Sequence, residues 1–221
     1  MTYRAAILLV ALAVAWGAVA SGGQPPRPSI VPTKPELEFT YETPQQIVLT
    51  PPGGKGPQTY WYVLYQIQNR TGADQIFAPD FVLYTDTGEV VRSGKGVPTT
   101  VFAAIQKRHN NPLLQNATGM TGRILQGADN AKDGVAIWRD FAPAARAFDV
   151  FVGGLSDERA VVKLPSPVMV EQRDAQGEVR SVARDEVTLA KTLKLSYSLP
   201  GEASARAAIK PKLIKKTWVM R

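Results

Sequence analysis

The stretch TYWYVLYQIQ, residues 59–68, decides the fold class of this 221-residue chain. It is rich in aromatic and β-branched residues, which are enriched in β-strands. Successive side chains of a strand point to opposite faces, so alternate residues share a face. One of these faces carries Trp61, Val63, Tyr65 and Ile67. The stretch therefore predicts a central strand with one face buried in a core.

The segments on either side continue the strand pattern. Residues 36–42 alternate strictly between polar and apolar, which predicts a strand with one buried face. After a turn at 69–72, residues 76–85 are predicted as the next strand, with Pro79 at a bulge or an edge. The Asp-Thr-Gly sequence at 86–88 then leads into 89–92, and this arrangement predicts a hairpin.

The second half of the chain adds one helix and further strands. A helix is predicted from Pro98 to about His109, with Lys107 and Arg108 in its last turn, where cations suit the helix dipole. Strand-like runs follow at 123–125, 135–138, 148–152, 159–164, 168–172, 178–182, 187–199 and 213–220. About ten short strands with one helix in a crossover loop predict an all-β, antiparallel β-sandwich. Trp61 and Trp138 are expected in its core.

The first twenty residues have the features of a secretory signal peptide. Arg4 precedes an unbroken apolar run of 16 residues, too short to span a bilayer comfortably as a helix. Ala18 and Ala20 supply the small side chains of a cleavage site, so cleavage is expected after Ala20. Residues 21–35 hold five prolines and are predicted to be a linker. The mature chain would then carry a single domain over 36–221, exported to the periplasm or the extracellular space.

The chain contains no cysteine. This excludes a disulfide framework, a thiolate metal site, a cysteine nucleophile and the lipid-modified cysteine of a bacterial lipoprotein. No transmembrane span is expected in the mature chain.

The basic residues are unevenly distributed. From Arg206 onward there are six basic residues and no acidic one, whereas the rest of the mature chain has as many basic as acidic residues. The basic segment contains Lys210, Lys212, Lys215 and Lys216. These lysines could protect the edge of a sheet, which is the favoured interpretation, or could bind an anionic polymer or membrane surface. Binding to nucleic acid is not expected, because the charge is confined to this segment.

Two stretches carry a resemblance to known proteins: NRTGADQIFAPDFVLYTDTGEVV at 69–91 and VAIWRDFAPAARAFDVFVGGLS at 135–156. With the strand at 59–68, they resemble the immunoglobulin-like β-sandwich domains of exported bacterial proteins of unknown function. The resemblance implies an immunoglobulin-like fold and an exported protein. It brings no catalytic residue with it.

Several side chains could carry chemistry, and each has a simpler structural interpretation. His109, the only histidine, is interpreted as a capping or solvated residue at the helix end. Asp129, Asp133 and Asp140 fall near the spacing of a calcium loop, but Ala131 occupies a ligand position, so a polar loop is favoured and no metal or cofactor is expected. The adjacent carboxylates at 157–158 and 185–186 are interpreted as solvated turns rather than glycosidase pairs.

Tyr60 and Tyr62 lie on the other face of the strand at 59–68, and an exposed row of rings there could bind a carbohydrate. The sequence as a whole predicts an exported, non-enzymatic protein with a structural or protein-binding role in the cell envelope. The alternative is a module that binds a carbohydrate or an anionic envelope polymer through the tyrosines and the basic end.

Overall fold

The computed structural model describes residues 25–54, 56–173, 177–201 and 209–221. Within these residues the chain divides into two compact units. One is the sandwich body, formed by Pro28–Arg159 and Ala190–Arg221. The other contains Ala160–Leu189, named the ribbon below.

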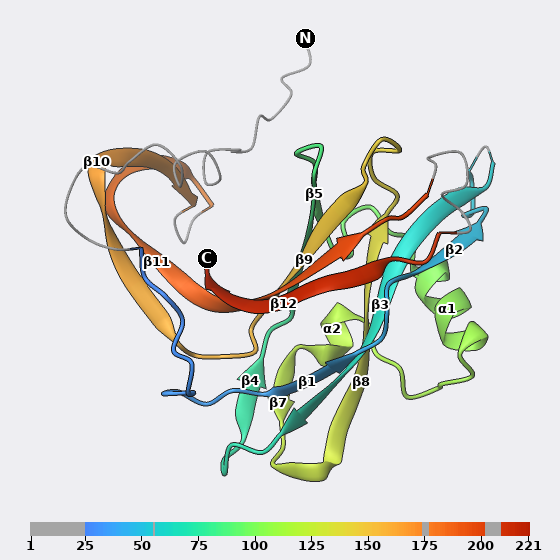
Figure 1. Cartoon of the computed structure of the whole chain (residues 1–221), viewed down its shortest axis with the longest axis horizontal. Coiled ribbons are helices and arrows are strands. Elements are labelled where there is room, and N and C mark those ends of the chain that lie inside the picture. The colour runs from blue at the N-terminus through green and yellow to red at the C-terminus, as the bar shows by residue number, and fades with distance from the viewer. Residues whose placement is uncertain (1–24, 55, 174–176, 202–208) are drawn as a thin grey trace. The chain divides into compact units, whose positions relative to one another are not determined.

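Strand β3 (Gln58–Asn69) is the centre of the first sheet of the body, as the sequence predicts (Figure 1). It pairs antiparallel with β8 (Gly127–Arg139) along one edge, and with β1 (Glu38–Tyr41) and β2 (Gln45–Leu49) along the other. The register places Trp61 opposite Trp138. The sequence pattern predicts β1 but not β2.

The second sheet of the body has the strand order β6, β5, β9, β11, β12. The bounds are Asp80–Thr85 for β5, Val90–Arg92 for β6, Ala147–Gly153 for β9, Val179–Ser198 for β11 and Lys212–Met220 for β12. The predicted hairpin is confirmed, because β5 and β6 pair antiparallel across residues 86–88. Gly88 in this turn has a φ of 87°, a conformation that glycine adopts without strain.

Pro79 separates two strands that belong to different sheets. Strand β4 (Gln75–Phe77) pairs with β7 (Gly122–Ile124), whereas β5 starts at Asp80 and pairs with β9. A proline cannot donate a ladder hydrogen bond, so at Pro79 the chain leaves the sheet of β4 and β7 and enters the sheet of β5 and β9. The sequence pattern predicts one interrupted strand here.

The two sheets of the body share a core that is rich in aromatic residues. Trp61 and Trp138 are each 1% exposed, which confirms that they are core residues. From the second sheet, Phe81, Phe148 and Tyr197 pack in the same cluster. The predicted all-β sandwich is therefore confirmed. Its immunoglobulin-like type stays a prediction.

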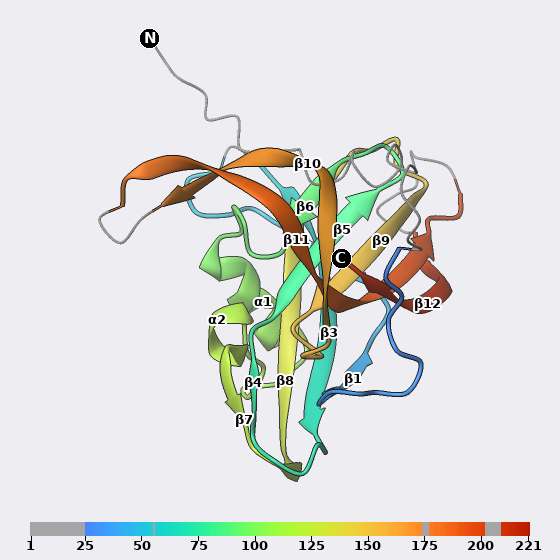
Figure 2. The ribbon, with the colours of Figure 1, turned by 90° about the vertical axis from the view of Figure 1, so that its left-hand side faces the viewer.

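Helix α1 (Thr99–Arg108) covers the outer face of β3 and β8, as Figure 2 shows. Val101 and Ile105 from the helix are buried against Tyr60 and Tyr62, which forms a second apolar cluster. The helix bounds agree with the sequence prediction. A short helix, α2 (Ala117–Met120), is capped by the Asn116 side chain and was not predicted.

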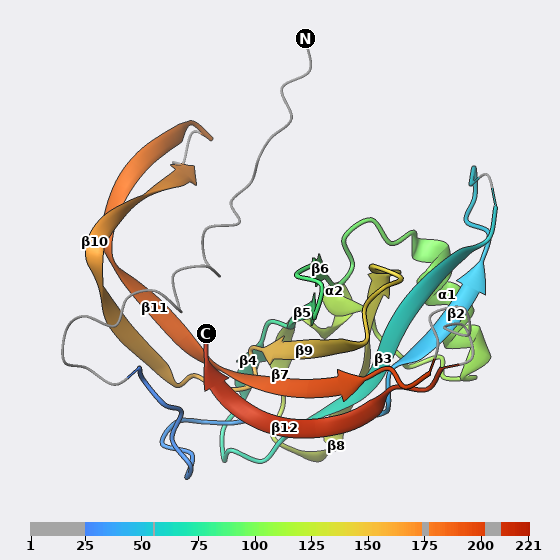
Figure 3. The ribbon, with the colours of Figure 1, turned by 45° about the horizontal axis from the view of Figure 1, so that its top comes forward.

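The ribbon consists of β10 (Arg159–Arg173) and the first half of β11 (Figure 3). The sequence pattern predicts four separate strands of the sandwich for β10 and β11, at 159–164, 168–172, 178–182 and 187–199. The gaps between these predicted strands contain Pro165 and Pro167 in one case and the charged residues 184–186 in the other. Both are tolerated because the strands are largely exposed, and a strand that pairs on one edge needs fewer N–H donors.

Candidate functional site

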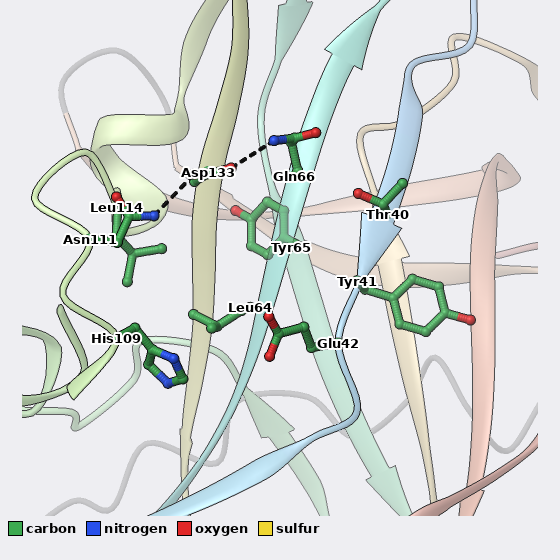
Figure 4. Close-up of a pocket in the computed structure, with 10 residues that line it drawn as sticks. All are labelled: Thr40, Tyr41, Glu42, Leu64, Tyr65, Gln66, His109, Asn111, Leu114 and Asp133. Atoms are coloured by element: carbon green, nitrogen blue, oxygen red, sulfur yellow. Dashed lines mark hydrogen bonds between the residues drawn. The ribbon is translucent and has the colours of Figure 1, made fainter.

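A hollow of about 300 Å³ lies on the outer face of the β3 sheet, where helix α1 ends (Figure 4). Its strand residues come from β1, β3 and β8. Glu42 directly follows β1, and the remaining residues come from the C-cap of α1 and the loop that follows. The lining residues are Thr40, Tyr41, Glu42, Leu64, Tyr65, Gln66, His109, Asn111, Leu114 and Asp133.

His109 is the C-cap residue of α1, which confirms the capping interpretation. Its Nε2 atom lies 2.9 Å from the hydroxyl of Tyr62. That hydroxyl donates to Gln45 Oε1 at 2.9 Å and accepts from Arg108 Nη1 at 3.4 Å. Since the hydroxyl proton goes to Gln45, the contact between Tyr62 and His109 forms a hydrogen bond when Nε2 of the imidazole carries a proton. Burial raises the pKa of Tyr62, and the nearby Arg108 opposes the shift.

The carboxylates of the hollow are held by side-chain amides. Asp133 accepts from Gln66 Nε2 and from Asn111 Nδ2, both at 3.0 Å. Glu42 accepts from Gln45 Nε2 at 3.0 Å. Neutral amides orient a carboxylate without adding charge, so this arrangement suits hydrogen bonding to a small polar molecule.

The structure corrects the expectation for Tyr60 and Tyr62. Both side chains are buried, at 1% and 0% exposed, because α1 packs over them. Alternation along β3 separates its two faces, but it does not reveal that a helix covers the second face. An exposed row of rings for carbohydrate stacking is therefore not formed by these residues.

The residues of the discounted calcium loop do not gather around one point. Residues 129–134 belong to strand β8, so the expected polar loop is wrong. Asp129 and Asp133 are about 13 Å apart along an extended strand. Asp140 Oδ1 accepts from Trp61 Nε1 at 2.8 Å. Gly134 is needed for packing, since a Cβ atom there would overlap the ring of Tyr65. Among the described residues, no group of three or more His, Asp or Glu side chains could hold a metal ion.

The basic end forms an edge strand. Leu213 to Met220 was predicted as a strand, and β12 confirms it by pairing with β11. Lys210, Lys212, Lys215 and Lys216 are all exposed. Lys216 Nζ lies 5.5 Å from the ring centre of Tyr41, within the range of a cation–π contact. Lysines in these places are typical of a protected sheet edge.

The predicted cleavage residues Ala18 and Ala20 lie outside the described residues, as does the rest of the signal-like segment. In the described part of the chain, no helix is long and apolar enough to cross a membrane.

A buried ion cluster was missed by the sequence analysis. Lys191, at the start of the body half of β11, is 1% exposed and lies 3.0 Å from Glu36 and 3.3 Å from Glu158. Its Nζ also donates to the carbonyl of Ser29 and lies 5.0 Å from the ring centre of Trp218. Lys191 lies on the same strand face as the buried apolar residues of β11, because it is an even number of residues away from them. This spacing is the signal in the sequence that could have revealed its burial.

The cluster corrects two expectations. Glu158 was interpreted as part of a solvated turn, but one oxygen accepts from the Ser29 backbone at 2.8 Å and the other faces Lys191. Ser29 lies in the segment predicted to be a linker, so this part of the linker is tied to the body.

The cluster makes stability depend on pH in a defined direction. Hydrogen bonds from Ser29, then the bond and charge of Lys191, hold the pKa of Glu158 below its ordinary value of 4.5. A carboxyl with a lowered pKa stabilises the fold above its unfolded pKa and loses this contribution as the pH falls. The free energy of unfolding of the wild type is thus expected to exceed that of Glu158→Gln at neutral pH, with the difference shrinking below pH 4.5.

Urea unfolding at a series of pH values measures this difference, with Asp157→Asn as the control. Asp157 is the exposed neighbour of Glu158, so its variant should follow the wild type throughout. Partners raise the pKa of Lys191 above 10.5 despite the opposing effect of burial, so the difference should persist into alkaline solution. A difference between wild type and Glu158→Gln that is the same at all pH values would contradict the prediction.

The ribbon exposes large aliphatic side chains. Val161 and Met169 on β10 are 60% and 59% exposed. On β11, Val179, Val182 and Val187 are also exposed. A hairpin of two strands is at best marginally stable in water without further packing. These side chains are therefore a second candidate site, suited to contact with another macromolecule.

Comparisons of the chain with protein-family models, with curated proteins and with solved structures found no match.

Proposed function

We propose that this protein is an exported, non-enzymatic protein with a structural or protein-binding role in the cell envelope, and that the ribbon is its binding element. The exposed aliphatic side chains on both ribbon strands are the observation that carries the proposal. Solvent-exposed apolar side chains that cluster on one element mark interaction sites more often than scattered ones do.

The charge of the ribbon favours a protein as the partner. Its strands mix basic residues, such as Lys163 and Arg184, with acidic residues, such as Glu171 and Glu186. A surface for nucleic acid or an anionic polymer would carry one sign of charge. Aliphatic side chains bordered by polar and charged ones are typical of contacts between proteins.

The hollow beside α1 fits a binding role, because amide donors orient its carboxylates Glu42 and Asp133. The signal-like sequence at residues 1–20 and the absence of cysteine support export by a bacterium.

A second candidate function is binding of an anionic envelope polymer. It is favoured by the exposure of Lys210, Lys212, Lys215 and Lys216 near the edge strand β12. This binding would depend on salt, because cationic side chains release counterions from a polyanion.

The proposal is tested by photo-crosslinking in the cells that export the protein. A photoreactive amino acid at Met169 of the ribbon is expected to give discrete protein adducts of higher mass. The same amino acid at Ile76, which is 68% exposed on β4 of the body, is the control and should give none.

The opposite outcome is also informative. Equal labelling from both positions, or none from Met169, would contradict a binding role of the ribbon. Salt-sensitive retention of the purified protein on heparin, lost when Lys212 and Lys215 become Gln, would then favour the polymer-binding candidate.

A further inference from the structure

In the part of the chain that the structure describes, β10 is the one strand that pairs with the ribbon part of β11. Within the described residues, β12 pairs with Lys191–Ser198 of β11 and β9 pairs with Leu193–Ser198. Along the ribbon part of β11, Val179–Leu189, the described pairing strand is thus β10. An unpaired strand edge presents a row of N–H and C=O groups to any added strand.

The two edges of the ribbon differ in their capacity to pair. Pro165 and Pro167 stand two residues apart in β10, and prolines in sheets lie where the nitrogen faces away from the ladder. The outer edge of β10 therefore lacks donors at alternate positions. The segment Val179–Leu189 contains no proline, so its edge keeps every donor.

The sequence of this edge fits a second copy of itself. Two copies that pair antiparallel about a two-fold axis meet through the same edge, so the same alternate residues of each strand direct their N–H and C=O groups toward the other strand. This condition is met only when one residue lies opposite its own copy on the two-fold axis. That residue is called the centre of the register. When Ala183 is the centre, Arg180 lies opposite Glu186 and Val179 lies opposite Val187, and each pair occurs twice.

The neighbouring registers are disfavoured by charge. A centre at Arg184 places this arginine opposite its own copy. A centre at Val182 places Arg180 opposite Arg184, and a centre at Asp185 places this aspartate opposite itself. Like charges directly opposite each other destabilise a sheet, and opposite charges stabilise it.

We propose that the chain forms a homodimer by antiparallel pairing of the β11 edges of two ribbons, centred on Ala183. The sheet in the dimer has the order β10, β11, β11 of the second copy, β10 of the second copy. This inference rests on the proposed role of the ribbon as a binding element, and it names a second copy of the chain as the partner at the edge. The apolar faces of the ribbon stay free for a different protein.

Cysteine crosslinking tests the register directly, because the wild-type chain has no cysteine. In the mature protein, Ala183→Cys places the two sulfur atoms together at the two-fold axis. Opposed Cα atoms in an antiparallel pair are about 4.5–5.5 Å apart, within the range of a disulfide. Mild oxidation is expected to give a covalent dimer. Ser181→Cys, on the same face, is the control, since its two copies would be about 13 Å apart.

Charge reversal provides an independent readout. Arg180→Glu places Glu opposite Glu at both ends of the register, and sedimentation equilibrium should show the dimer Kd rising about tenfold or more. Arg180→Glu combined with Glu186→Arg restores opposite charges and should restore the wild-type Kd. A destabilised fold would not be rescued by the second substitution.

The results separate this inference from the proposed function. A monomeric wild type, or equal crosslinking through Ala183→Cys and Ser181→Cys, overturns the dimer. If Met169 still forms adducts with a different protein in that case, the binding role of the ribbon stands. If Ala183→Cys crosslinks but Met169 yields no adduct, the dimer stands and the binding role in the envelope fails.

Discussion

Trp138→Ala is expected to lower the free energy of unfolding by about 3–5 kcal/mol, since truncation of a buried aromatic residue loses apolar burial and leaves a cavity. The ring is 1% exposed and lies in the core between the two sheets. It makes a T-shaped contact with the ring of Phe81, and the two ring centres are 6.4 Å apart. Opposite it on β3 is Trp61, so the cavity would open beside another core ring. Chemical denaturation of the mature protein measures the loss.

Trp138→Phe is the matched control and should cost much less. The indole N–H of Trp138 has no hydrogen-bond partner among the described residues, so removal of this group leaves no partner unsatisfied. Trp61→Phe is expected to cost more than Trp138→Phe, because it deprives Asp140 of a donor at 2.8 Å. Equal stabilities for Trp138→Ala and wild type would show that the ring is not in the core.

Gly154→Ala is expected to cost roughly 2–5 kcal/mol, from a disfavoured backbone conformation together with overpacking. Gly154 has a φ of 85°, which is strained for a residue with a Cβ atom. A Cβ atom there would also overlap the carbonyl oxygen of Ala78. This carbonyl belongs to the crossing between β4 and β5, so it cannot move without disturbing both sheets.

The adjacent Gly153→Ala is the control for Gly154→Ala. A Cβ atom at Gly153 would meet the Asp80 side chain at 3.4 Å, which is an ordinary contact. Thermal unfolding of both variants should therefore give a large drop in Tm for Gly154→Ala and a small change for Gly153→Ala. Similar drops for the two would contradict the role assigned to the backbone conformation.

Local patterns predicted much of the sandwich. β3, the hairpin of β5 and β6, helix α1 and the edge strand β12 all follow from alternation, turn residues or helix signals over a few residues. Two strands were predicted incompletely. The strand at 76–85 was divided by Pro79 between two sheets, and β8 extended through the polar residues 129–134. A run of polar residues is easily predicted as a loop, because the sequence does not show which strand it pairs with.

The candidate sites were less predictable, because each depends on residues far apart in the sequence. Lys191 is buried only because Glu36 and Glu158 approach it from other segments. His109 was correctly placed at a helix end, but its contact with Tyr62 required knowledge of the sheet face that the helix covers.

The sequence by itself determined that the chain is all-β, that Trp61 and Trp138 are core residues, and that it lacks cysteine, because these depend on composition and on the two-residue period of a strand. The tertiary structure alone decided that Tyr60 and Tyr62 are covered and that residues 160–189 form a separate ribbon. The reason is physical: the period of a strand tells which side chains share a face, whereas burial of that face depends on which distant segment packs against it.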